Sequence, residues 1–115
     1  MRIAIAMTAL FLLAGCTGPT SNGAGKRIDL HDNHFEDGNF TVAAGASVTY
    51  RNEGQRAHTV TIHWVGDPLT TYRLDETLPP GEEVSYTFPA AGTYHVFCRL
   101  HGTMTTGMAS VVQVT

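Results

Sequence analysis

The sequence predicts a small all-β domain, and two observations support this prediction. From residue 27 onward no window shows the apolar spacing of a helix, whereas apolar and polar residues alternate in short runs. Gly, Pro and Asn interrupt these runs at short intervals, and these residues supply the backbone angles of turns. We therefore expect a Greek-key β-sandwich of about seven or eight strands.

Each expected strand rests on this alternation of apolar and polar residues. The alternation is clearest over residues 47–50, 58–63, 84–88, 94–98 and 112–114. Turn-forming residues lie between the expected strands, at 44–45, 52–54, 66–68, 79–81 and 91–92. The segment from Gly66 to Leu78 is the least regular, and we expect a loop or a short irregular strand there.

The beginning of the chain has the pattern of a bacterial export signal. Arg2 is its only early charge, and the apolar run from Ile3 to Leu13 is too short to span a bilayer. The residues Leu13-Ala14-Gly15-Cys16 resemble the lipobox of bacterial lipoproteins, in which the cysteine becomes the lipidated first residue of the mature chain. The alternative is an ordinary signal peptide followed by a coincidental cysteine.

We therefore expect three segments in this chain of 115 residues. Residues 1–15 form a lipoprotein signal peptide. Residues 16–26 hold the lipidated Cys16 and a flexible tether rich in Gly, Ser and Thr. Residues 27–115 form a single domain. The protein would then be exported and lipid-anchored at the outer face of the bacterial cell membrane or in the periplasm.

Charge and cysteine content narrow the possible functions. The net charge is −3 with neutral histidines, and no basic patch suggests that the chain binds nucleic acid. Cys98 is the only cysteine besides Cys16, so the processed chain has no internal disulfide to form. A lone thiol in an exported protein needs another explanation.

A set of soft metal donors supplies that explanation. Cys98 and His101 lie on one loop at the end of an expected strand, and a methionine follows on the same loop. His58 opens another expected strand, and a Greek key can bring it to the same end of the sandwich. Two imidazoles and a thiolate with a weak axial thioether are the donors of a blue-copper site. The sequence therefore predicts one type 1 copper ion per chain.

The motifs around these donors resemble the plastocyanin, pseudoazurin and amicyanin group of cupredoxins. The resemblance rests on Asn52 six residues before His58, on Gly-x-Tyr before Cys98, on Cys-x-x-His, and on Gly107-Met108 before the last strand. It covers essentially all of residues 27–115. It implies a cupredoxin-like fold and a single copper ion that shuttles electrons between larger redox complexes.

Two features depart from the family pattern. Met108 follows His101 by seven residues, a longer spacing than usual in plastocyanins, whereas Met104 offers a shorter, amicyanin-like spacing. We expect Met108 to be the axial ligand because it shares strand parity with the valines of the last strand, and Met104 remains the alternative. Thr59 follows His58 where plastocyanins and amicyanins usually carry Asn, so the support around the cysteine is expected to differ.

The remaining histidines and the acidic residues fit no ligand pattern. We interpret four histidines as ordinary polar positions because none fits the ligand pattern: His31, His34, His63 and His95. His95 in addition has strand parity opposite to that of Cys98. Four acidic residues could form a docking face for a basic partner, but we favour a solvated surface; they are Asp75, Glu76, Glu82 and Glu83.

The expected function is one-electron transfer between redox protein partners by a monomer attached to the membrane through Cys16. The alternative is a copper-binding or copper-delivery lipoprotein. An enzyme is not expected, because a multicopper oxidase needs further histidine-rich sites, and a cysteine nucleophile needs a separate base and an oxyanion site.

Overall fold

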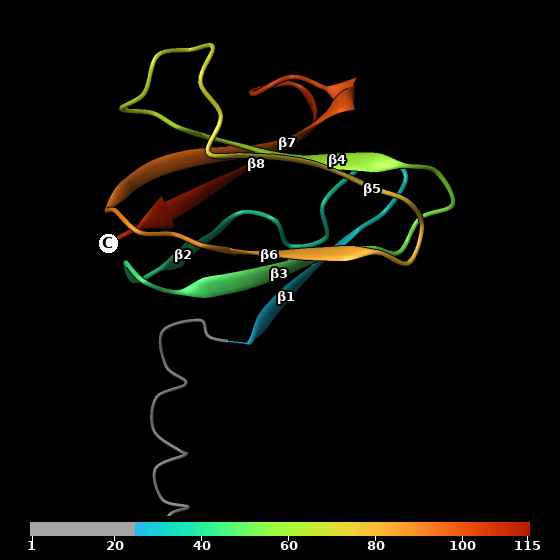
Figure 1. Ribbon diagram of the computed structural model, residues 1–115, viewed down its shortest axis with the longest axis horizontal. Coiled ribbons are helices and arrows are strands. Elements are labelled where there is room, and N and C mark those ends of the chain that lie inside the picture. Colours follow the sequence, from blue (N-terminus) through green and yellow to red (C-terminus); the bar gives the residue numbers. More distant parts are fainter. Residues whose placement is uncertain (1–24) are drawn as a thin grey trace, which may run out of the picture.

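The structure of the protein is a computed structural model that describes residues 25–115, and it consists of two facing β-sheets (Figure 1). The smaller sheet has the order β1 (Lys26–Leu30), β3 (Ser47–Asn52) and β6 (Glu83–Thr87). β1 runs parallel to β3, and β3 runs antiparallel to β6.

The larger sheet has five strands and carries the expected metal donors. Its order is β2 (Phe40–Val42), β8 (Gly107–Val114), β7 (Gly92–Gly102), β4 (His58–Trp64) and β5 (Leu74–Leu78). β4 runs antiparallel to both β5 and β7, and β7 runs antiparallel to β8, whereas β2 pairs parallel with β8. The predicted all-β sandwich of seven or eight strands is thus confirmed, with eight strands in the described part of the chain.

The core lies between the two sheets and follows the alternation seen in the sequence. Every second residue of β3 and of β8 is buried, as expected for strands with one face toward the core. The largest fully buried side chains include Tyr50, Tyr94, Phe88, Ile28, Leu30 and Ile62. Cys98 and Met108 belong to the same apolar cluster, so both point into the sandwich.

Two connecting segments rise from the larger sheet on the side away from the smaller sheet (Figure 1). They are residues 65–73, drawn in yellow-green, and residues 103–106, drawn in orange-red. The first segment covers the outer face of the sheet, because the Tyr72 ring meets the Phe97 ring edge-on at 5.9 Å. Within the segment predicted to be irregular, residues 74–78 form β5 and pair antiparallel with β4.

The predicted signal peptide and Cys16 lie outside the described residues. Within residues 25–115 there is no helix long and apolar enough to cross a membrane.

Candidate metal centre

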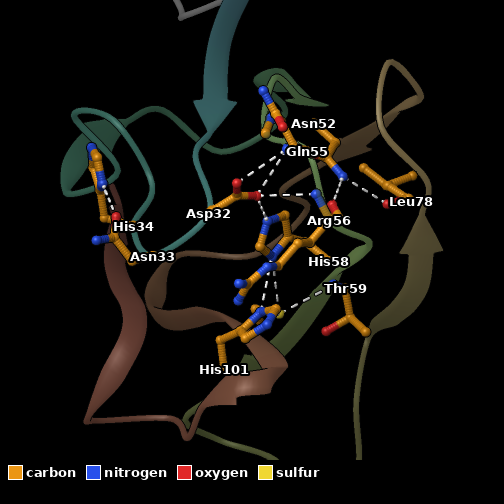
Figure 2. A network of polar contacts seen from close by, with 12 residues as sticks. Asp32, Asn33, His34, Asn52, Gln55, Arg56, His58, Thr59, Leu78 and His101 are labelled. Carbon is orange, nitrogen blue, oxygen red and sulfur yellow. Dashed lines mark hydrogen bonds and ion pairs between the residues drawn. The ribbon is translucent and has the colours of Figure 1, made fainter.

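The turn before β4 positions His58 at the end of the larger sheet. The buried Asn52 side chain donates from Nδ2 to the carbonyls of Arg56, at 2.7 Å, and Leu78, at 2.9 Å (Figure 2). Its Oδ1 accepts from the backbone N–H of Gly54 at 2.8 Å. Asn52 therefore ties both ends of the turn to the end of β5, which explains why an asparagine stands six residues before His58.

A carboxylate on the loop after β1 holds the far side of the His58 ring. Asp32 Oδ1 lies 3.0 Å from His58 Nε2 and accepts from the backbone N–H groups of Gln55, at 2.9 Å, and Arg56, at 3.1 Å (Figure 2). A Cβ on Gly54 would clash with the Asp32 carboxylate, so this approach requires glycine. The hydrogen bond with His58 is the main cause that lowers the pKa of Asp32.

The contact with Asp32 selects the tautomer of His58. A carboxylate accepts hydrogen bonds, so Nε2 carries the proton and donates it to Asp32. The lone pair of Nδ1 is then free for a metal, in the arrangement by which carboxylates orient metal-binding histidines. The His58 side chain is fully buried, so this orientation is fixed inside the protein.

Cys98 lies at the end of the regular part of β7 and is also fully buried. Its Sγ accepts a hydrogen bond from the backbone N–H of Thr59 at 3.3 Å. This contact holds the sulfur in place, and cysteine binds metals through its thiolate. Cys98 is the only free cysteine among the described residues.

The structure brings the three predicted equatorial donors together. His58 Nδ1 and His101 Nδ1 are 3.0 Å apart, and Cys98 Sγ lies 3.7 Å from His58 Nδ1 and 3.5 Å from His101 Nδ1. Donors that share one ion through bonds of about 2.0–2.3 Å lie about 3–4 Å from one another. These separations therefore suit a single small cation.

The donor set fits a type 1 copper site. Two imidazole nitrogens and a thiolate with an axial thioether select copper over harder metals, which prefer oxygen donors. The three side chains form the one group of three or more His, Cys, Asp or Glu donors found in residues 25–115. Two of them are buried and held by hydrogen bonds from outside the triangle, so the site is preorganised.

The two methionines lie in different surroundings. Met108 is 1% exposed, and it lies in the same core cluster as Cys98. Met104 is half-buried and, together with His95 and Thr105, lines a cavity of about 250 Å³. Because His95 has the strand parity opposite to Cys98, this cavity lies on the outer face of the sheet. This placement favours Met108 as the axial donor, which stays a prediction.

A tight turn accounts for the long spacing between His101 and Met108. The Thr103 N–H donates to the Thr106 carbonyl at 2.9 Å, and Gly102 pairs with Gly107. Gly107 has a φ of 71°, a backbone conformation that glycine adopts without strain. The extra residues thus form the tip of a hairpin, and the chain returns to the sheet before Met108.

The other histidines are not part of the donor group. His31 Nε2 contacts Glu36 at 2.6 Å, and His34 Nδ1 contacts Asn33 at 2.8 Å. His63 is 2% exposed, and its Nδ1 donates to the Thr71 carbonyl at 3.0 Å. His63 is therefore a buried polar residue whose ring makes a structural hydrogen bond.

His95 stacks near His63, with ring centroids 6.5 Å apart. Its Nδ1 is buried and has no hydrogen-bond partner among the described residues. Burial is the main cause that lowers the pKa of His95, and the neighbouring His63 adds to this effect.

Two of the four acidic residues noted in the sequence have cationic partners nearby. Asp75 Oδ1 lies 2.9 Å from Arg99 Nε, and Glu83 Oε1 lies 3.3 Å from Arg51 Nη1. These contacts neutralise part of the acidic surface, and the solvated-surface interpretation stays a prediction.

Sequence reasoning missed two supporting groups, Asp32 and the pair Thr61 with Asp75. Asp32 lies 26 residues before His58, on a different loop, so no local sequence spacing predicts its contact with His58. The pairing of Thr61 with Asp75 depends on β5, whose partner the irregular segment did not reveal. The only sequence signal was Thr59 after His58, which indicated that the hydrogen bonds around Cys98 differ from those usual in the family.

Comparison with known proteins places the chain in a family. Residues 3–111 match the family described as a cupredoxin-like domain, so the chain belongs to the cupredoxins, as the motifs predicted. The match includes most of the segment expected to be a signal peptide. No curated protein matches the chain.

Solved structures share the fold. A purple cupredoxin from Nitrosopumilus maritimus is 18% identical with a TM-score of 0.62, and the match covers 78% of this chain and 99% of that protein. Amicyanin from Paracoccus versutus is 21% identical with a TM-score of 0.64, and the match covers 78% and 80% of the two chains. A copper-containing nitrite reductase from Thermus scotoductus is 20% identical with a TM-score of 0.64; the match covers 78% of this chain but 22% of the reductase.

Proposed function

We propose that the chain is a blue-copper electron carrier with one type 1 copper ion held by His58, Cys98, His101 and Met108. The observation that carries this proposal is the triangle of donors 3.0–3.7 Å apart, in which His58 and Cys98 are fully buried. Copper supplies a one-electron couple between its Cu(I) and Cu(II) states. The protein contributes ligands that need little rearrangement between these two states.

Each ligand has a distinct task in this proposal. His58 is held by Asp32 on its Nε2 side, so it offers Nδ1 in one fixed orientation. Cys98 offers a thiolate that accepts the Thr59 N–H. His101 is less buried than the other two and follows Leu100, which is 55% exposed. Electrons would therefore enter and leave through the His101 edge.

Spectroscopy of the copper-loaded protein tests this proposal. We expect one Cu(II) per chain, an intense thiolate-to-copper charge-transfer band and a reversible one-electron wave in cyclic voltammetry. Cys98→Ser should abolish the band because oxygen replaces the sulfur donor. His63→Ala and His95→Ala serve as matched controls and should leave the spectrum nearly unchanged. A colourless Cu(II) protein, or loss of the band in either control, would contradict the assignment.

Copper delivery is the alternative that the same protein preparation can exclude. A delivery protein needs a site that exchanges its ion, whereas a carrier retains it. When the copper-loaded protein is incubated with a chelator, the rate of copper loss should be much lower than the rate of electron exchange. Rapid transfer without a reversible wave would favour delivery.

We further propose that Cys16 is lipidated and anchors the mature protein at the outer face of the membrane. The support is the lipobox-like sequence Leu13-Ala14-Gly15-Cys16. Mass spectrometry should find an acylated mature N-terminus at Cys16, and Cys16→Ser should abolish the acylation. Cys98→Ser is the control and should remain acylated. A wild-type chain that is soluble and carries no acyl group would refute the anchor.

The proposed partners are redox proteins, and the proposed carrier is a monomer without catalytic activity. The similarity to a nitrite reductase covers a small part of that enzyme, so it supports the fold rather than a shared reaction. Sedimentation of the copper-loaded protein tests the monomer, and stopped-flow mixing with small redox proteins tests electron exchange.

A further inference from the structure

The backbone pairing of β4 with β7 stops short of the metal donors. Its last pair is Thr61 with Phe97, and the pairing of β7 with β8 also becomes irregular between Phe97 and Gly102. Beyond this point the Arg99 N–H donates to the Thr59 hydroxyl at 2.8 Å, while the Thr59 N–H donates to Cys98 Sγ. Thr59 therefore makes two hydrogen bonds to the Cys98-Arg99 unit where the regular ladder has ended.

A second hydroxyl continues this contact across the sheet. Thr59 Oγ1 lies 2.9 Å from Thr61 Oγ1, and Thr61 Oγ1 donates to Asp75 Oδ1 at 2.8 Å. Each hydroxyl has one proton, and the proton of Thr61 is used by Asp75. Thr59 must therefore donate to Thr61, which leaves the lone pairs of Thr59 for the Arg99 N–H. The carboxylate of Asp75 thus determines which group donates in each hydrogen bond of this network.

The Arg99 side chain also contacts Asp75, so the hydrogen-bond network both begins and ends at this carboxylate. Arg99 Nε lies 2.9 Å from the same Asp75 oxygen that accepts from Thr61. The network therefore crosses the outer face of the sheet from β5 over β4 to β7, and it contacts Arg99 at both the backbone and the side chain. Thr59 is 1% exposed and Thr61 is fully buried, so water does not compete for the central hydroxyls.

We propose that Thr61 and Asp75 are positioning residues for Cys98, acting through Thr59. They orient the Thr59 hydroxyl toward the Arg99 N–H, which holds the Cys98-Arg99 backbone against β4. This in turn maintains the hydrogen bond from the Thr59 N–H to the Cys98 sulfur. This inference rests on the proposed copper-binding function where it concerns the metal. The part that concerns the backbone stands on the hydrogen bonds alone.

Substitution of Thr61 tests the inference with two independent readouts. In Thr61→Val, amide hydrogen exchange of Arg99 in the metal-free protein should become about three- to tenfold faster, the change expected when one hydrogen bond is weakened. In the copper-loaded protein, the charge-transfer band and the copper hyperfine splitting should shift. Thr61→Ser keeps the hydroxyl and should restore both wild-type values.

Thr49→Val is the matched control, because it removes a hydroxyl pair with Ser85, at 2.7 Å, on the smaller sheet. It should leave the Arg99 exchange rate and the copper spectrum unchanged. If Thr61→Val does not fold, Asp75→Ala on β5 replaces it and should produce the same two changes. Wild-type exchange at Arg99 in these variants, or an equal spectral shift in Thr49→Val, would overturn the proposal.

The two readouts separate this proposal from the copper function. If the wild-type protein shows no charge-transfer band, the proposed function fails, whereas the exchange rate of Arg99 still decides whether the chain of hydrogen bonds holds the backbone. If the band is present and the exchange rate rises without any spectral shift, the claim that Thr61 and Asp75 position Cys98 is wrong.

Discussion

The Nε2 atom of His58 lies 3.0 Å from Oδ1 of Asp32 (Figure 2). The loop after β1 of the smaller sheet therefore orients a metal donor on β4 of the larger sheet. The same carboxylate accepts two backbone N–H groups of the turn that leads into β4. Asp32 therefore couples the conformation of this turn to the direction of the His58 ring. Contacts of this kind support metal ligands by fixing their orientation.

Asp32→Ala should weaken copper binding by about 10–100-fold, the usual effect of losing a group that orients a ligand. It should also raise the reduction potential, because a nearby negative charge favours Cu(II) over Cu(I). Asp32→Asn keeps an acceptor oxygen for His58 and should weaken binding less. Competition with a chelator measures the affinity, and voltammetry measures the potential.

Asp29→Asn is the control for the loss of one negative charge. Asp29 pairs with Arg27 at 2.8 Å on β1 and makes no contact with His58. It should leave copper affinity close to that of the wild type. Equal effects of Asp29→Asn and Asp32→Ala would show that net charge, rather than orientation of His58, determines the affinity.

The equatorial donors could be predicted from the sequence because their signals are local. Cys98 and His101 share one loop, and Asn52 marks the turn before His58. Strand alternation also predicted the burial of Met108, since parity along a strand needs no knowledge of its neighbours.

Contacts between strands distant in sequence could not be predicted in this way. The parallel pairing of β1 with β3 places the loop that carries Asp32 near the turn before β4, and nothing in the sequence specifies this pairing. The alignment of Thr61 with Asp75 likewise depends on the register between β4 and β5. Register is set by packing of whole strands rather than by spacing within one of them.

The ion pair between Asp67 and Arg73 should make stability depend on pH at the acidic end. Asp67 Oδ2 lies 2.6 Å from Arg73 Nε, and this hydrogen bond is the main cause that lowers the pKa of Asp67. A lowered folded-state pKa contributes stability above the unfolded-state pKa, and this stability is lost as the pH falls through the folded-state pKa.

Asp67→Asn should therefore lower the free energy of unfolding near neutral pH and reduce its fall toward acid. Urea unfolding at several pH values between about 2 and 7 measures this difference. Glu76→Gln removes a charge that forms no ion pair with another described residue and should retain the wild-type slope. An unchanged slope in Asp67→Asn would show that the pair does not contribute.

The hydroxyl of Tyr50 is buried in the core and has no hydrogen-bond partner among the described residues. Burial raises the pKa of Tyr50, as expected for a phenol that cannot ionise in the core. Because an unsatisfied buried polar group is costly, Tyr50→Phe should maintain or increase stability, by up to about 1–2 kcal/mol. Thermal unfolding of the metal-free protein measures this change.

Tyr94→Phe is the matched comparison. The Tyr94 hydroxyl is also in the core, but it donates to the Ala90 carbonyl at 2.8 Å. Its removal should lower stability by about 1 kcal/mol, or roughly 4–8 °C in melting temperature. If Tyr50→Phe destabilised the protein as much as Tyr94→Phe does, the Tyr50 hydroxyl would have a partner that residues 25–115 do not supply.

The axial position distinguishes the two methionines of the domain. Met108 is in the core cluster that contains Cys98, whereas Met104 lines a cavity with His95 on the outer face of the sheet. An axial thioether stabilises Cu(II) and tunes the potential. Met108→Leu should therefore raise the reduction potential of the copper-loaded protein, and Met104→Leu should change it little. Both substitutions replace a thioether with a hydrocarbon of similar size, so each variant controls for the other. The opposite ranking of the two potentials would assign the axial ligand to Met104, and the hairpin tip at residues 103–106 would then have to move to the inner side of the sheet when copper binds.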